Sequence, residues 1–219
     1  EVLDVGATAF RPLTGPTFGL SAEAVPLPEG VLLIDGATRQ CWIWNGTDAP
    51  QPTGSLQRAR LFFRATALAD GRVLVTGGWP QEALSERTAR PAPTAPRFDL
   101  PIECYHPRKQ RWSLWKGTLP ARAGHQALLL KDGRVLLLGG FGAEPNHPLD
   151  TAQIVDPNRE VLLDLLPMPN LGLSPGAATL SEELILLPER TPHLVRLTSP
   201  ERPNEASKRL SLANAFLAP

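Results

Sequence analysis

The sequence predicts an all-β protein built from repeated four-stranded units. Three observations lead to this prediction. The phrase DGRVLVTGG at residues 70–78 returns as DGRVLLLGG at residues 132–140. The chain of 219 residues contains 24 Pro and 18 Gly, a composition that favours short strands joined by turns over long helices. Strand-like segments follow one another without a helical pattern between them, so alternating strands and helices are not indicated.

The repeated phrase belongs to a longer repeat of 18 residues. The four copies, two clear and two fainter, are 61–78, 123–140, 19–36 and 172–189. Successive copies end 42, 62 and 49 residues apart, and the mean of about 51 is close to the spacing of one propeller-type unit. The longest interval contains residues 79–101, a Pro- and Ala-rich stretch that we interpret as a loop insertion.

Within a copy the expected elements follow in a fixed order. HQALLL at 125–130 predicts a short strand, and Asp132–Gly133 predicts a tight type I′ turn. RVLLL at 134–138 is apolar without alternation, which suits a strand covered on both faces. Gly139–Gly140 then end this strand where a side chain would obstruct a close approach of the backbone. The same positions of the preceding copy hold Asp70, Gly71, Gly77 and Gly78.

Two outer strands complete each unit. IECYHP at 102–107 and RWSLW at 111–115 predict the third and fourth strands of one unit. TAQIVDP at 151–157 and EVLLDLL at 160–166 repeat this layout in the next. Four strands per unit without helices are typical of a β-propeller. Residues 1–13 look like the outer half of one more unit, so we expect about four to five blades, either closed as a small ring or part of a larger one.

The propeller is expected to span residues 1–203, followed by a tail at 204–219. The tail carries Ala206, Leu210, Ala213 and Leu217 at helical spacing behind an Asn. We therefore predict a short C-terminal helix or partner-docking segment there.

The DGRVL turn, the Gly pair, ECYHPRKQRW (103–112) and LPARAGH (119–125) together resemble the kelch repeat of galactose-oxidase-like β-propellers. This resemblance implies that Tyr105 and Trp112 pack between neighbouring blades. It also implies that 119–122 link one blade to the inner strand of the next. The third unit departs from the pattern with Val155 in place of the Tyr, and the fourth has Pro188–Glu189 in place of the Gly pair.

The resemblance to galactose oxidase does not extend to its chemistry. The copper site of that enzyme takes two tyrosines and two histidines, whereas this chain has a single Tyr. Its four histidines show no metal-ligand spacing, and no nucleophile or nucleotide-binding motif is present. We therefore predict no cofactor and favour a protein without catalytic activity.

Charge and cysteine content restrict the class of partner. Lys+Arg and Asp+Glu both number 22, so the net charge is zero and a nucleic-acid partner is not indicated. No apolar run approaches the roughly 18 residues of a membrane span. Cys41 and Cys104 fit no zinc or redox pattern and are interpreted as free thiols, with a single disulfide left open.

The chain does not begin with Met, which suits a processed chain or a segment of a longer one. Repeats of the DGRVLLLGG kind are similar to those of bacterial secreted kelch-like proteins. A periplasmic or extracellular location is the expectation that follows.

Candidate binding residues are expected on one face, where the loops after the second strands and the loops into the inner strands gather. Arginines and aromatic residues on loops over a rigid scaffold are typical of partner binding. The candidates are Trp79, Phe141, Arg64, Arg87, Arg90, Arg97, His125 and His147.

We accordingly expect a non-catalytic interaction module that binds a protein partner, as a subunit or domain of a larger assembly. The alternative is a secreted propeller that binds, or hydrolyses, a carbohydrate or other small ligand held by Trp79, Arg90 and His125. A purely architectural propeller outside the cytoplasm is a third hypothesis.

Overall fold

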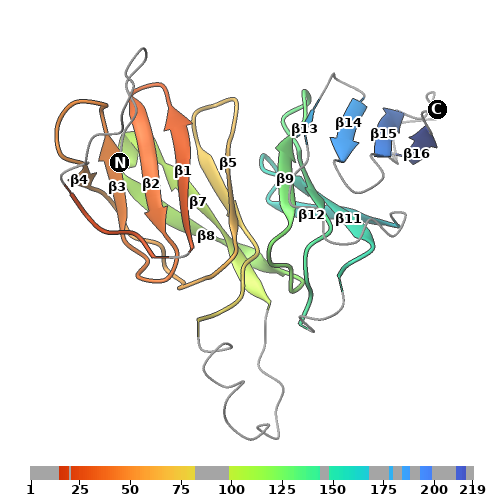
Figure 1. Ribbon diagram of the computed structural model, residues 1–219, viewed down its shortest axis with the longest axis horizontal. Helices are drawn as coiled ribbons and strands as arrows, with labels where there is room; N and C mark the ends of the chain where they lie inside the picture. Colours follow the sequence, from red (N-terminus) through yellow and green to blue (C-terminus); the bar gives the residue numbers. More distant parts are fainter. Residues whose placement is uncertain are drawn as a thin grey trace, which may run out of the picture.

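The protein is all-β in its computed structural model, which describes residues 15–19, 21–81, 99–143 and 148–167 and the backbone of four further strands. Four antiparallel sheets of four strands each lie side by side (Figure 1). Across the described ranges the one helical element is a 3₁₀ turn, Pro107–Lys109. No helix among these residues has the length and apolar character needed to cross a membrane.

Each sheet is formed by four strands that are consecutive in the chain. The first two sheets consist of β1 (Ala22–Leu27), β2 (Gly30–Asp35), β3 (Cys41–Trp44), β4 (Gln51–Pro52), β5 (Arg64–Ala67), β6 (Val73–Thr76), β7 (Leu100–His106) and β8 (Arg111–Leu119). The other two consist of β9 (Gln126–Leu129), β10 (Val135–Leu138), β11 (Thr151–Asp156), β12 (Val161–Pro167), β13 (Ala178–Thr179), β14 (Leu184–Leu187), β15 (His193–Thr198) and β16 (Ser211–Ala215).

The first strands of neighbouring sheets are adjacent, since β1 lies beside β5 and β5 beside β9. This arrangement is consistent with the blades of a β-propeller-like fold. Because the strands are antiparallel, each sheet has two distinct ends. We call the end with the first–second and third–fourth turns the hairpin face. The opposite end, with the second–third connections and the links into the next sheet, is the loop face.

The core lies between the sheets, and the second strands supply its centre. All four residues of β6 and all four of β10 are buried, as expected for apolar strands covered on both faces. Val73 and Val75 pack with the first sheet, while Leu74 between them packs with the third. The alternation of side chains along one strand thus places two hydrophobic clusters on opposite faces of the second sheet, one shared with the first sheet and one with the third.

The turn between β5 and β6 differs from the predicted type I′ geometry. Gly71 has a φ of +87°, but Asp70 is not among the described residues with positive φ. Gly71 N donates to Leu68 O at 3.0 Å and Leu68 N to Arg72 O at 2.8 Å, which closes a type I turn with a glycine bulge. The Asp70 carboxylate accepts from Arg72 N and Nε, and this bonding favours the longer loop. The turn at 130–134 is built in the same way.

The C-terminal tail does not form the predicted helix over its described part. Ser211–Ala215 is strand β16, and it pairs antiparallel with β15 from Leu194↔Ala215 to Thr198↔Ser211. Pairing with the open edge of β15 satisfies the backbone groups of this segment. Tertiary pairing has therefore overridden the helical spacing of its apolar residues.

Candidate functional site

Three aromatic rings contact one another on the loop face of the second and third sheets. Phe62 lies just before β5, whereas Trp79 and Phe141 each follow a Gly pair after β6 and β10. The ring centroids of Phe62 and Trp79 are 5.9 Å apart, and those of Trp79 and Phe141 are 6.2 Å apart. We call these three residues the aromatic trio. The sequence placed Trp79 and Phe141 together on this face but did not single out Phe62.

Backbone pairing holds the trio in place. Leu61 and Trp79 exchange two hydrogen bonds of 2.8 Å, so the segment before β5 is paired with the segment after β6. Ala123 and Phe141 exchange two bonds of the same length in the third sheet. The Trp79 indole Nε1 also donates to Gly142 O at 3.0 Å, which ties the two sheets together.

Phe62 has a backbone conformation that normally requires glycine. Its φ is +58°, and the equivalent residue of the next copy, Gly124, has a φ of +63°. Phe62 N donates to Ser21 Oγ at 2.7 Å, and Phe62 O accepts from Gly124 N at 2.7 Å. The left-handed conformation costs an ordinary residue about 1–2 kcal/mol. The protein bears this cost while leaving the Phe62 side chain 46% exposed.

A buried ion pair anchors the loop that carries Phe62. Arg60 and Glu103 are both fully buried, with guanidinium and carboxylate 2.8 Å apart. The Glu103 carboxylate also accepts from Gln57 N at 2.7 Å and Arg58 N at 3.0 Å. Arg60 donates in addition to Gly77 O at 2.9 Å. One carboxylate on β7 therefore fixes the backbone of residues 57–60.

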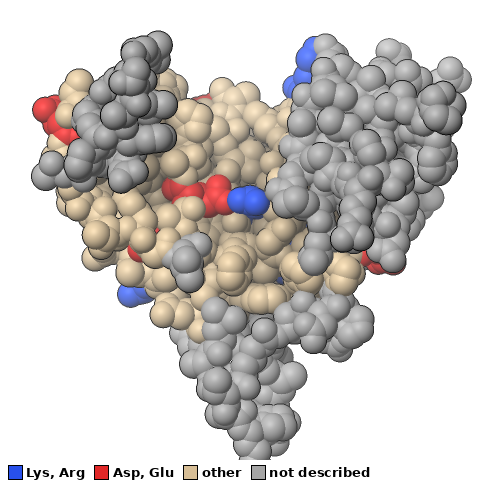
Figure 2. All heavy atoms as spheres, in the orientation of Figure 1, with Lys and Arg blue, Asp and Glu red and all other residues tan. Residues whose placement is uncertain are grey.

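A second polar link joins three sheets near their inner strands. Arg64 on β5 donates to Glu23 on β1 at 2.6 Å, and its Nε donates to His125 O at 3.0 Å. Both charged side chains are partly exposed. Figure 2 shows one face of the molecule, on which the described surface carries few charged side chains.

His125, a predicted binding residue, is fully buried. Its Nε2 lies 2.9 Å from Thr76 Oγ1, and its Nδ1 has no hydrogen-bond partner. Burial, with smaller effects from the charges of Arg122 and Arg64, lowers the pKa of His125 to about 3. The imidazole is therefore neutral and packs beneath the loop face rather than toward solvent.

This burial predicts a pH dependence of stability. Below about pH 6.5 the unfolded chain binds a proton at His125 that the folded protein does not bind until about pH 3. The free energy of unfolding should therefore fall as the pH drops through this window, by up to about 1.4 kcal/mol per pH unit. Urea unfolding between pH 7 and pH 5 measures the slope. His125→Phe, which copies Phe63 of the preceding repeat, should flatten it, and equal slopes would contradict the assignment.

Tyr105 and Trp112 lie at the boundary between the first and second sheets. Their rings are 5.1 Å apart and pack with Val25 and Leu32 of the first sheet. The Tyr105 hydroxyl lies 2.5 Å from Thr53 Oγ1. Both residues thus occupy the space between neighbouring sheets.

Four predicted site residues, Arg87, Arg90, Arg97 and His147, lie outside the described residues. Of the insertion at 79–101, the described ends include Trp79 and Leu100, the latter already part of β7. In the described part of the chain, no group of three His, Cys, Asp or Glu side chains is arranged to hold a metal ion. Cys41 and Cys104 are buried free thiols, and burial raises the pKa of Cys41 to about 12, so this thiol is unreactive.

No protein-family model and no curated protein matches the sequence. Among solved structures, the chain is similar to the one described as "Structure of YjhT", with a TM-score of 0.65 and 12% sequence identity. The similarity covers 92% of this chain and 66% of that one, so this chain spans about two thirds of the other's length. At this identity the likeness concerns the fold alone.

Proposed function

We propose that this protein is a non-catalytic interaction module that binds a protein partner through its loop face. The observation that carries the proposal is Phe62, an exposed aromatic ring in a backbone conformation where the next copy has glycine. Backbone strain that the surrounding structure maintains is characteristic of functional positions.

The aromatic trio has the properties of a binding hot spot. Phe62 is presented on a backbone fixed by Ser21 and Gly124, so little conformational entropy is lost when a partner covers it. The Phe62 ring stands nearly perpendicular to that of Trp79, with an interplanar angle of 85°, and Trp79 is supported by Phe141. Aromatic anchors that become buried under a partner contribute much of the binding energy in protein interfaces.

The proposal includes a wider context. The sheets are taken as kelch-type blades, about four to five in this chain, within a small ring or as part of a larger one. The module acts as a subunit or domain of a larger assembly, in the bacterial periplasm or outside the cell. Neutral overall charge is compatible with an interface in which apolar contacts outweigh charge steering.

The test is Phe62→Gly, which removes the ring and suits the backbone. The variant should keep its melting temperature within a few degrees of the wild type, because glycine relieves the positive φ. Loss of a hot-spot ring should weaken the partner complex about 30-fold or more. Native mass spectrometry of the protein purified gently from its own source, as wild type and variant, measures the complex.

Phe18→Ala is the matched control, since Phe18 is a comparably exposed aromatic residue packed on Trp42 of the first sheet. A complex that survives Phe62→Gly, or that Phe18→Ala disrupts equally, would overturn the proposal. A glycan panel on the same proteins addresses the carbohydrate alternative. Of the residues assigned to it, His125 is buried and Trp79 is only 8% exposed. If the wild type binds a glycan and Phe62→Gly abolishes this binding, the ligand of the loop face is a carbohydrate and not a protein.

A further inference from the structure

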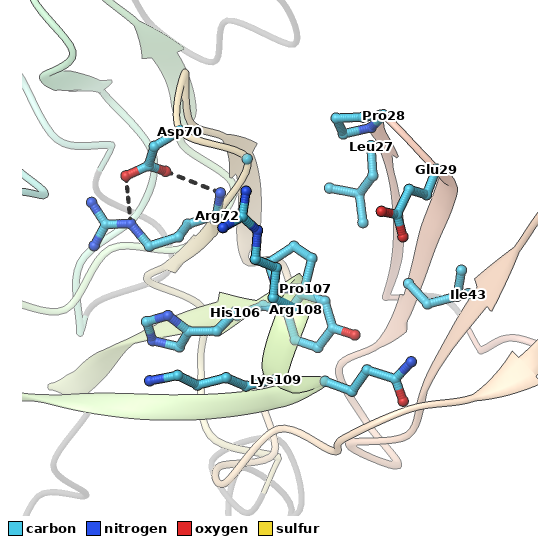
Figure 3. Close-up of a pocket in the computed structure, with 13 residues that line it drawn as sticks. Leu27, Pro28, Glu29, Ile43, Asp70, Arg72, His106, Pro107, Arg108 and Lys109 are labelled. Carbon is cyan, nitrogen blue, oxygen red and sulfur yellow. Dashed lines mark hydrogen bonds and ion pairs between the residues drawn. The ribbon is translucent and has the colours of Figure 1, made fainter.

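A pocket of about 550 Å³ opens on the hairpin face, between the first and second sheets. One wall is the β1–β2 turn with Ile43 of β3, and the other is formed by the β5–β6 and β7–β8 turns. Figure 3 shows Leu27, Ile43 and the carboxylate of Glu29 on the first wall, with His106, Arg108 and Lys109 on the second. The volume falls within the range of small-molecule sites. The pocket lies at the end of the sheets opposite the aromatic trio.

Comparison of the repeats explains why the pocket exists. Between the second and third sheets, Arg72 reaches across to the β11–β12 turn, where it donates to Asn158 Oδ1 at 3.2 Å. In the first copy, 19–36, the position of Arg72 in 61–78 is taken by Gly30. Gly30 has a φ of +139°, and a Cβ there would overlap Trp44 O. No side chain can therefore bridge the first and second sheets at this point.

The β7–β8 turn at the pocket differs in charge from the corresponding β11–β12 turn at the bridged boundary. By sheet register, Arg108 is the equivalent of Asn158, so a cation stands where the neighbouring turn has an amide. Neither Arg108 nor the adjacent Lys109 has an ion-pair partner among the described residues, and both are exposed. Arg72 is paired with Asp70. The β7–β8 turn therefore presents two cations without an ion-pair partner in the described part of the chain, across the pocket from a wall that carries Leu27 and Ile43 together with one carboxylate, Glu29.

His106 shows the effect of this local charge. Its Nε2 lies 2.9 Å from Ser113 Oγ. Burial, followed by the charges of Lys109 and Arg72, lowers the pKa of His106, while Asp70 and Glu160 act in the opposite direction.

We propose that this pocket binds a small organic oxyanion, with the anionic group on Arg108 and Lys109 and an apolar body against Leu27 and Ile43. An arginine fork beside a lysine suits carboxylates and phosphate monoesters alike. Neither Arg108 nor Lys109 belongs to the hydrophobic core, so both are available to a ligand without loss of packing.

The experiment titrates the full chain with phenyl phosphate and with benzoate, by calorimetry and by NMR of the His106 imidazole, with benzyl alcohol as the neutral probe. We expect saturable binding of at least one anion at concentrations up to about 10 mM and none of benzyl alcohol. If phenyl phosphate binds more tightly, the natural ligand is a phosphate ester. If benzoate binds more tightly, it is a carboxylic acid. Absence of saturable binding of both anions, or equal binding of benzyl alcohol, would overturn the proposal.

The double variant Arg108→Gln, Lys109→Gln should weaken anion binding at least about tenfold without changing the melting temperature. Arg159→Gln is the matched control, because Arg159 holds the Lys109 position in the third sheet and lies outside the pocket. Equal weakening by Arg159→Gln would mean general charge attraction and would refute the site.

The bound anion should also raise the pKa of His106, since it offsets the positive charges of Lys109 and Arg72. Asp70 and Glu160 already act on His106 in this direction, and the bound anion would add to their effect. Saturable binding with no change in the His106 titration would place the anion elsewhere.

Discussion

Glu103→Gln is expected to lower the free energy of unfolding by about 3–5 kcal/mol, because it leaves the Arg60 cation buried without a counter-charge. Glutamine keeps the shape of glutamate, but Gln57 N and Arg58 N bond to different carboxylate oxygens, so one of these amides loses its acceptor. The loss therefore reports the missing charge together with one backbone hydrogen bond, and no cavity is created. For a chain of this size the melting temperature should fall by on the order of 10 °C.

Glu23→Gln is the control for this prediction. Glu23 and Arg64 form an ion pair of 2.6 Å, slightly shorter than that of Arg60 and Glu103, but both side chains are partly exposed. Solvent screening limits such a pair to about 1 kcal/mol or less. Urea unfolding gives the free energy of unfolding of each variant. Similar m-values would make the losses from the two ion pairs directly comparable. A similar small loss for both would mean that water reaches Arg60 in the folded protein.

The ion pair also shows where sequence reasoning stops. Arg60 and Arg122 each stand one residue before a clear copy, a signal that an alignment of the repeats contains. Their partners differ, because β7 has Glu103 where β11 has Gln153 in the same register. Arg122 is consequently bonded to neutral groups, Gly139 O and Thr151 O, and burial lowers its pKa to about 10. Only the register of the strands shows which arginine is neutralised.

The positions of the strands and turns in the two clear copies were predictable, since apolar runs and Asp-Gly pairs act locally, but the type of the turn was not. The tail was not, because the pairing of β16 with β15 is decided by an open sheet edge and not by the spacing of apolar residues in the tail. Phe62 was overlooked for a related reason. Its importance depends on a φ of +58° that only a comparison with Gly124 suggests. His125 was predicted as a binding residue on the loop face, whereas the structure buries its imidazole in the core.

The Gly pair after the second strand is expected to tolerate no side chain at its first position. Gly77 has a φ of +59°, and a Cβ there would overlap Arg122 O and lie 2.7 Å from His125 Cε1. Gly77→Ala therefore combines a left-handed alanine with a steric clash against the link into β9. Each effect costs about 1–3 kcal/mol, so a total loss of about 3 kcal/mol or more is expected.

Gly71→Ala separates these two effects. Gly71 also has a positive φ, +87°, but a Cβ at this position would meet no atom within 4 Å, so only the conformational cost of about 1–2 kcal/mol applies. The free energies of unfolding of the two variants, measured by thermal and urea unfolding, should differ only by the cost of the steric clash at position 77. If both lose the same stability, the approach of Arg122 to Gly77 is looser than the distances above indicate. If Gly77→Ala is clearly worse, the Gly pair is required because the next sheet packs directly on its backbone.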